Sequence, residues 1–311
     1  MHNIIEQFRN EILTSGLEPP IIIEPGKFHR FPGYGKGISN KSAWCRLFPD
    51  MLGGIFGDFS SGLSKIWYTN RSNLSILEQN DLVKKSAKMR EDARLKEERT
   101  HALAKDKATR IWMISDLAPN NHLYFYRKKM KTYGLKLYKG DLVINGMPCD
   151  GSIIVPIRHK DEICSLQFIN PEGCKRFLPG GRILGCYYVL GSNELPTDGC
   201  LFVTEGLATA ATINEETDYP VAVSFYSGNL NEVTQNLIRV LPASVELIIA
   251  CDNDRHNKDN PGLTYGRKAA VNAGISFVWP DFPCTNCECS DFNDLKRCFL
   301  KNKDGLNEKL K

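Results

Sequence analysis

The sequence predicts an α/β protein: a C-terminal parallel sheet with helices on both faces, preceded by a basic mixed α+β subdomain and a small β-rich N-terminal module. Beyond residue 196, apolar runs (CLFVT, VAVSF, VELIIA and ISFVW) alternate with helical stretches of roughly 10–15 residues, the pattern of strands joined by crossover helices. The run at 245–250 is almost continuously apolar, as in a strand covered on both faces. At 311 residues the chain is also long enough for about two globular units.

Composition is typical of a soluble globular protein. With 42% hydrophobic and 24% charged residues the chain can bury a substantial core, which excludes a disordered or collagen-like chain. No run approaches the ~18 uninterrupted apolar residues of a membrane span, and the polar N-terminus lacks the features of a secretory signal. Eleven cysteines without such a signal indicate reduced thiols. We therefore expect a cytoplasmic protein without a membrane partner.

Residues 1–75 predict the small β-rich module. Short aromatic or β-branched runs alternate there with glycine and proline punctuation, which favours tight turns between antiparallel strands. With one cysteine, Cys45, and two histidines, His2 and His29, the module lacks the ligands of a zinc ribbon. It is either a zinc-free module for a template or partner, or simply a small β fold.

Three further segments follow. Residues 76–115 are dense in charges of both signs, and the helical stretch within them has neither glycine nor proline, which predicts a long solvated linker helix. Residues 116–195 return to short strands and carry the basic element CKRFLPGGR, so we expect a basic, nucleic-acid-binding subdomain. Residues 196–311 hold the alternating strands and helices, and we expect the catalytic domain there.

Three acidic residues directly follow predicted strands. Glu205 comes after LFVT, and Asp252 and Asp254 come after VELIIAC. Ligands of an open parallel sheet bind beyond the carboxyl ends of its strands, so these side chains are expected to converge. Carboxylate oxygens suit Mg²⁺ or Mn²⁺, and one of them can instead take a proton from an attacking hydroxyl. This combination is what phosphoryl or nucleotidyl transfer requires.

The segments VTEGLATA, IACDNDRH and DFNDL resemble the Toprim domain of DNA primases of the plasmid and phage type, which belong to mobile genetic elements. NHLYFYRKK, IIVPIR, SLQFINPEGCKRFLPGG and YSGNL resemble further segments of that family, so the resemblance covers roughly residues 122–295. The acidic motifs are shared by all Toprim proteins, whereas SLQFINPEGCKRFLPGG is more specific to primases.

The resemblance implies roles for individual residues. Glu205, Asp252 and Asp254 would be the catalytic residues, with Glu205 as the acid/base. Together with Asp291, in DFNDL, they would also hold Mg²⁺ or Mn²⁺. Asn229, in the loop SGNL, would contact the nucleotide or a metal-bound water.

Two basic segments are candidates for nucleic-acid binding. Arg127, Lys128 and Lys129 begin a run of cations interleaved with tyrosines, which can neutralise phosphates and stack on bases. The same run could be a solvated amphipathic element with its tyrosines packed inward. Lys175 and Arg176, in CKRFLPGGR, can approach a triphosphate or template backbone closely; a simple exposed hairpin is the alternative.

The cysteines and a missing motif bear on function as well. The C-terminal cysteines include one C-x-x-C pair, whereas a structural zinc site usually has two, so metal binding there stays open. These residues are Cys284, Cys287, Cys289 and Cys298. No G-x-x-x-x-G-K-[ST] occurs, which excludes a fused helicase of the P-loop type.

Together these features predict a DNA primase, a nucleotidyltransferase of the DNA-directed RNA polymerase type that makes short RNA primers on single-stranded DNA during DNA replication. Its partners would be the template, NTPs and a separate replicative helicase or replication initiator. Two alternatives stay open. One is a Toprim-type nuclease that uses the same metal-bound carboxylates on DNA or RNA. The other is a non-catalytic Toprim module of replication or recombination.

Overall fold

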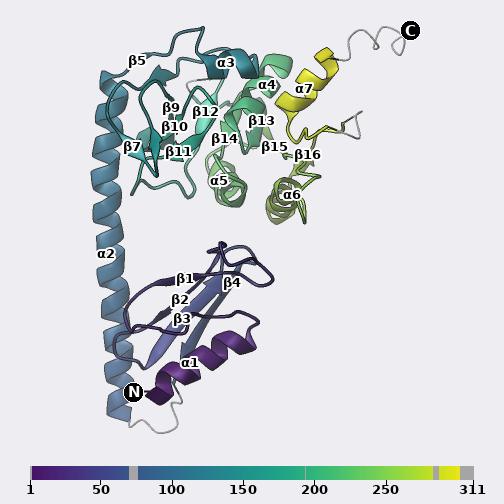
Figure 1. Ribbon diagram of the computed structural model, residues 1–311. Helices are drawn as coiled ribbons and strands as arrows, with labels where there is room; N and C mark the ends of the chain where they lie inside the picture. Colours follow the sequence, from purple (N-terminus) through teal and green to yellow (C-terminus); the bar gives the residue numbers. More distant parts are fainter. Residues whose placement is uncertain (1, 70–75, 193, 283–286, 302–311) are drawn as a thin grey trace. The chain divides into compact units, whose positions relative to one another are not determined.

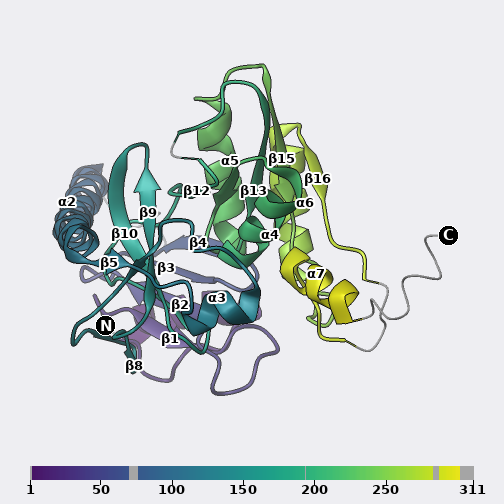
Figure 2. The same cartoon turned by 90° about the horizontal axis from the view of Figure 1, so that it is seen from above.

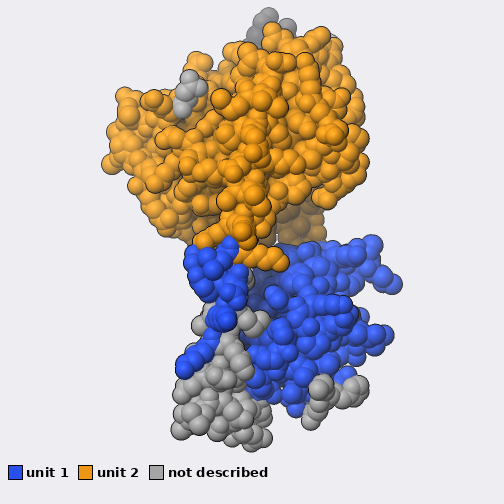
Figure 3. All heavy atoms as spheres, turned by 90° about the vertical axis from the view of Figure 1, so that its left-hand side faces the viewer, with its two compact units in different colours: residues 1–95 blue, residues 96–311 orange. Residues whose placement is uncertain are grey.

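The computed structural model describes residues 2–69, 76–192, 194–282 and 287–301 (Figure 1). The chain divides into two compact units, residues 1–95 and residues 96–311, which Figure 3 colours separately. Each unit is described by itself. Among the described residues, every helix is too short or too polar to cross a bilayer.

Unit 1 is an antiparallel four-stranded sheet with one helix. The sheet order is β1-β2-β3-β4, so each strand pairs with its neighbours in the chain. Its elements are α1 (His2–Thr14), β1 (His29–Phe31), β2 (Ala43–Leu47), β3 (Gly53–Asp58) and β4 (Leu63–Tyr68).

Helix α1 was not among the expected elements, and it supplies much of the core of unit 1. Phe8 and Ile12 lie four residues apart on one helical face and are fully buried. The ring of Phe8 packs edge-on against Phe56 of β3, with centroids 6.1 Å apart. A Cβ on Gly54 would lie 2.5 Å from the Phe8 ring, so the glycine permits this close approach of helix and sheet.

The predicted linker helix is α2 (Ile76–Ile114), 39 residues long. At 1.5 Å per residue, this corresponds to roughly 60 Å. The division between the units falls within it, after Leu95. Near its C-terminal end the helix is partly buried, in contrast to the predicted solvated linker. Ala108 and Ile111 belong there to a core cluster of unit 2 with Leu166 and Phe168.

Unit 2 contains a first sheet that is antiparallel throughout, in the order β11-β10-β9-β6-β5. Short elements surround this sheet, among them the hairpin of β7 and β8. The strands and the associated elements are β5 (Asp116–Leu117), α3 (Leu123–Lys128), β6 (Lys136–Leu137), β7 (Val143–Ile144), β8 (Met147–Pro148), β9 (Ile153–His159), β10 (Glu162–Ile169) and β11 (Lys175–Phe177).

The second sheet of unit 2 has the order β12-β14-β13-β15-β16, with β12 antiparallel and the other pairings parallel. This confirms the predicted mixed α/β architecture. The elements are β12 (Tyr188–Leu190), β13 (Gly199–Thr204), α4 (Leu207–Thr217), β14 (Val221–Val223), η2 (Ser227–Asn229), α5 (Leu230–Ile238), β15 (Val245–Ala250), α6 (Pro261–Ala273), β16 (Ser276–Val278) and α7 (Phe292–Lys301).

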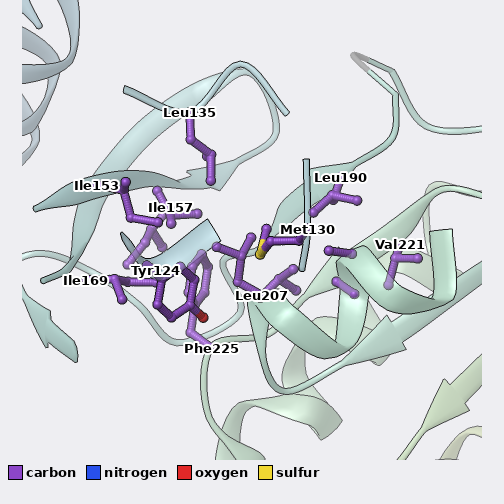
Figure 4. Close-up of a cluster of buried hydrophobic side chains, with 14 of the residues drawn as sticks. Tyr124, Met130, Leu135, Ile153, Ile157, Ile169, Leu190, Leu207, Val221 and Phe225 are labelled. Atoms are coloured by element: carbon purple, nitrogen blue, oxygen red, sulfur yellow. The ribbon is translucent and has the colours of Figure 1, made fainter. Parts of the chain in front are cut away.

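Two hydrophobic clusters cover the two faces of this sheet. On one face, helices α5 and α6 pack against β13 and β15. The helices contribute Leu230, Leu237 and Ala270, and the strands contribute Leu201, Val203 and Ile249. On the other face, residues of α4 pack with side chains of the first sheet in one continuous cluster. Figure 4 shows Leu207 of this cluster beside Tyr124, Ile157 and Phe225. The two sheets of unit 2 therefore share a core.

Substituting adjacent residues of α1 tests the packing of unit 1. Ile12→Ala should lower the free energy of unfolding of unit 1 by about 2–5 kcal/mol, because it removes fully buried methyl groups. Leu13→Ala is the matched control, since Leu13 is 45% exposed and should cost well under about 1 kcal/mol. Hydrogen exchange of the amides in β2 and β3 measures both. Equal effects of the two variants would contradict the packing described.

Candidate active site

The carboxyl ends of β13 and β15 bring Glu205 and Asp252 to the same edge of the second sheet. The two strands pair directly in parallel, with Thr204 opposite Ala250. Glu205 follows Thr204, and Asp252 lies two residues beyond Ala250. Figure 2 shows β13, β15 and β16 side by side, with α4 and α7 nearby. The expected convergence of the strand ends is thus present in the structure.

The carboxylates at this edge repel one another. The pKa of Glu205 is raised to about 7; burial is the largest cause, the charges of Asp254 and Asp291 act in the same direction, and the charge of Lys175 opposes them. Burial and the charges of Glu205, Asp291 and Asp254 together hold the pKa of Asp252 well above its ordinary value. The structure therefore brings all four predicted acids into one electrostatic cluster.

Asp291 joins this cluster from the beginning of α7. Its Oδ1 accepts a hydrogen bond from the backbone N–H of Asp294 at 2.7 Å, as an N-cap residue does. Burial and the neighbouring charge of Asp294 raise the pKa of Asp291, while Lys128 and Lys175 oppose this shift. Asp291 is thus a fixed side chain of the site rather than a surface acid.

The loop that holds Asp252 and Asp254 is packed against the start of α6. The backbone N–H of Gly262 donates to Oδ2 of Asp254 at 2.9 Å. A Cβ at Gly262 would lie 2.7 Å from the carbonyl oxygen of Asp252 and 2.9 Å from Oδ2 of Asp254, which leaves space only for glycine. Gly262 was not among the predicted site residues, although it follows Asn260 and Pro261, an N-cap residue and a first-turn proline that are typical of a helix start.

Among the described residues, no cationic side chain neutralises the cluster through a close ion pair. Within the part of the chain that the structure describes, no salt bridge involves Glu205, Asp252 or Asp254. Asp252 has one side-chain partner there, the hydroxyl of Thr209, at 3.5 Å. Carboxylate oxygens are hard donors, and without a close cationic partner among the described residues they fit a small divalent cation such as Mg²⁺ or Mn²⁺.

Lys175 is the cation that faces the acids. A Cβ on Gly206, which follows Glu205, would lie 4.0 Å from Nζ of Lys175. Although the residue as a whole is exposed, burial around its ammonium group lowers the pKa of Lys175, and the charges of Glu205, Asp252 and Asp291 oppose that shift.

Arg176 lies on the opposite face of the same strand, because successive side chains of a strand alternate. It is paired in register with Phe168, which belongs to the core cluster that includes residues of α2. Its buried Nε has no hydrogen-bond partner among the described residues. The structure therefore separates Lys175, which lies at the acidic site, from Arg176, which does not.

The other predicted cations lie at the end of α3. Arg127, Lys128 and Lys129 line a hollow of about 820 Å³ together with Arg297 of α7. The charge of Lys128 acts on both Lys175 and Asp291, so the hollow adjoins the acidic cluster. Binding of nucleic acid by these residues stays a prediction. Their side chains line the hollow, where they can contact the phosphates of a polyanion.

The side chain of Asn229 is placed differently from the expectation that it contacts the nucleotide or a metal-bound water. It is fully buried, and its Oδ1 accepts from the N–H of Gly185 at 2.7 Å. Its Nδ2 donates to the carbonyls of Ile183, Cys186 and Ser224. Because the amide group is engaged with backbone, Asn229 fixes the loop after β14 rather than offering a contact to a ligand.

Two further residues of the site were not predicted. Asn293 is buried, and its Nδ2 donates to the carbonyl of Lys128 at 2.7 Å and to the hydroxyl of Thr212 at 3.0 Å. It thereby ties α7 to α3 and α4. The buried hydroxyl of Tyr124 has no partner among the described residues, and burial and the charge of Asp291 raise its pKa. The asparagine of DFNDL was the available signal for Asn293.

The parallel sheet, with acidic residues at the carboxyl ends of β13 and β15, has the arrangement that the sequence motifs predict. No protein-family profile matches the chain. It is homologous to DNA primase TraC of Escherichia coli, with 27% identity over 277 residues, which cover 87% of this chain and 25% of the relative. A second E. coli protein of that name is 33% identical over 123 residues, covering 38% of this chain and 8% of the relative. The chain thus spans about a quarter or less of these relatives.

Solved primase structures share a distant likeness. The Aquifex aeolicus primase, with its zinc-binding and RNA polymerase domains, is 14% identical with a TM-score of 0.42, over 98% of this chain and 90% of that one. The primase fragment of the bacteriophage T7 primase-helicase protein is 16% identical with a TM-score of 0.39, over 59% of this chain and 72% of that one. At these values the roles of residues have to be argued from this chain's own geometry.

Because the pKa of Glu205 is raised, we expect its ionised carboxylate to lower the free energy of unfolding of the metal-free chain above neutral pH. Between about pH 4.5 and 7 the folded chain keeps a proton that the unfolded chain has lost, so stability falls through this window. Glu205→Gln removes that charge and should raise the unfolding free energy of the chelator-treated protein by about 1–3 kcal/mol at pH 8, with little effect at pH 5. Differential scanning calorimetry measures both.

The matched control for this variant is Glu246→Gln. Glu246 is an exposed glutamate on β15, near the end of the strand away from the site, and its replacement should leave the stability at either pH unchanged. If Glu205→Gln stabilised the chain equally at pH 5 and pH 8, the buried charge would not be the cause.

Proposed function

We propose that this chain synthesises short RNA primers on single-stranded DNA by divalent-metal-dependent nucleotidyl transfer, as a nucleotidyltransferase of the DNA-directed RNA polymerase type. The observation that carries the proposal is the cluster of Glu205, Asp252 and Asp254 at adjoining strand ends, without a neutralising ion pair among the described residues. The homology to DNA primase TraC supports the same activity.

The acids supply the ligands of the proposed metal. Asp252, Asp254 and Glu205, with Asp291 beside them, would hold Mg²⁺ or Mn²⁺. When bound, the cation acts as a Lewis acid that stabilises negative charge on the phosphoryl oxygens. It would also offset the mutual repulsion that, after burial, is the second cause of the raised pKa of Glu205 and Asp252.

Glu205 is the proposed proton acceptor. The 3′-hydroxyl of one nucleotide attacks the α-phosphate of the next, and pyrophosphate leaves. In the metal-free chain the pKa of Glu205 is raised to about 7, and a cation bound beside it would lower that pKa and favour the deprotonated carboxylate that accepts the proton. Its position directly after β13, on a strand fixed by pairing on both sides, keeps the carboxylate oriented.

Cations beside the acids would receive the phosphates. Lys175 reaches the acidic cluster itself, so its ammonium group contacts the triphosphate. Arg127, Lys128 and Lys129 would hold the single-stranded template in the hollow at the end of α3, where Tyr126 is exposed for stacking on a base. Arg176 points to the other face of its strand, so we leave it out of the substrate site.

The partners belong to the same proposal. The chain would act on a single-stranded DNA template with NTPs, in the cytoplasm, and on behalf of a mobile genetic element. A replicative helicase or replication initiator would be a further partner, and the 311 residues themselves contain no P-loop motif that could drive a helicase.

A priming assay tests the proposed activity. The chain is incubated with single-stranded DNA, labelled NTPs and Mg²⁺ or Mn²⁺, and short oligoribonucleotides should appear that a chelator abolishes. Glu205→Gln and Asp252→Asn should each reduce their formation at least about 100-fold, because proton transfer or metal binding is lost. Glu246→Gln is the control and should keep full activity. Shortened DNA without synthesis would instead indicate a nuclease, and binding alone a non-catalytic module.

The two neighbours on β11 provide a second test of the substrate site. Lys175→Gln should raise the KM for NTP about tenfold or more, since one charged contact to phosphate is worth roughly 1.5–3 kcal/mol. Arg176→Gln should change it little, because its side chain lies on the opposite face of the strand. Steady-state priming kinetics distinguish the variants. An equal rise in KM for both would contradict the placement of Lys175 at the nucleotide.

A further inference from the structure

Three cysteine sulfurs lie close together between the segment before α7 and α7 itself, on residues that the proposed acidic site does not use. The Sγ atoms of Cys287, Cys289 and Cys298 all lie within 4.8 Å of one another. Cys287 and Cys289 are half-buried and Cys298 is buried. Cys284, the fourth cysteine of the sequence pattern, lies outside the described residues. Nothing in the proposed primase mechanism uses these thiols.

The spacing of the sulfurs fits a soft metal ion. Zinc–sulfur bonds of about 2.3 Å in a tetrahedral site separate neighbouring sulfurs by roughly 3.8 Å, so only small shifts are needed here. The cysteines line a hollow of about 460 Å³ together with Glu288, Asp294 and Arg297. Thiolate ligands select zinc over the hard cations that suit the carboxylate cluster.

A cationic side chain supports the negative charge that thiolate ligands would carry. Nη2 of Arg255 donates to Sγ of Cys287 at 3.0 Å and to its carbonyl oxygen at 3.1 Å. The guanidinium of Arg255 also lies over the ring of Phe282, 4.7 Å from its centroid, which orients it. Charge-assisted hydrogen bonds to sulfur lower the cost of deprotonating the cysteine.

We propose that the reduced chain binds one Zn²⁺ through the thiolates of Cys287, Cys289 and Cys298. In this structure Cys287 is disulfide-bonded, so the arrangement corresponds to the oxidised form of the site. A dithiol reductant breaks that disulfide, becomes a cyclic disulfide itself, and leaves two protein thiols. The three ligand thiols then release three protons as they bind Zn²⁺, which gives a complex with a net charge of −1.

The zinc would stabilise the position of Asp291 without binding to the acidic site itself. Cys289 lies two residues before Asp291, and Cys298 lies on α7, whose first turn Asp291 caps. Binding both cysteines to one ion fastens the segment that carries Asp291 to the helix that carries Asn293. This consequence for the acidic site rests on the proposed function, whereas zinc binding itself does not. Oxidation would release the ion and loosen the segment.

Metal analysis of the full chain tests the proposal. The protein is first reduced with a phosphine, which is oxidised to its phosphine oxide with oxygen from water while the disulfide becomes two thiols. The reduced protein is then incubated with Zn²⁺ and dialysed, and its zinc content is measured. Wild type should retain one zinc per chain, and Co²⁺ in its place should give the absorption of thiolate-to-metal charge transfer. Cys289→Ser should lose at least tenfold in zinc affinity. Cys289→His, which preserves a zinc ligand, should retain the metal.

The matched control is Cys174→Ser, since Cys174 is an exposed, free cysteine elsewhere in unit 2 and should not affect zinc content. Circular dichroism checks that each variant is folded. The proposal is overturned if reduced wild type holds no more zinc than Cys289→Ser, or if Cys174→Ser loses the metal to the same extent. Because no step measures priming, failure of the primase proposal would leave this result unaffected.

Discussion

Repulsion among carboxylates crowded at one end of the second sheet is the interaction on which the rest of the account depends. Parallel pairing of β13 with β15 places Glu205 and Asp252 at one edge, and α7 adds Asp291. Burial and like charge raise the pKa of all three, so the metal-free fold carries an unfavourable charge cluster. The charge of Lys175 opposes these shifts without reversing them, so a bound cation would be needed to offset the remaining negative charge.

Much of the site could be predicted because it depends on local order along the chain. A strand followed at once by an acid places that acid at the carboxyl edge of a parallel sheet, which fixed the positions of Glu205 and Asp252. Asn229 could not be predicted in the same way. Its loop motif was visible, but only the fold shows that four backbone groups occupy its amide. The role of Gly262 could not be predicted either. Only the fold shows that the loop of Asp252 lies too close to this residue for a Cβ to fit.

The fold was predictable to a similar depth. Period and length identified the alternating strands and helices of the second sheet and the long charged helix, since these depend on neighbouring residues. Helix α1 was not predicted; its apolar stripe includes Phe8 and Ile12, but it precedes a longer glycine-rich segment whose turns and short strands dominate the local pattern. The separation of Lys175 from Arg176 was also missed, although alternation along a strand requires it once the strand is known.

The location of a bound divalent cation would show whether the carboxylates at the end of the second sheet are metal ligands. Crystals of the chain soaked in Mn²⁺ and measured at the manganese absorption edge would show the ion as an anomalous difference peak. We expect a peak among the carboxylate oxygens of Glu205, Asp252 and Asp254, at metal–oxygen distances of about 2.0–2.2 Å. A fully occupied manganese site elsewhere, with these three carboxylates bound to protein groups or to water alone, would contradict it.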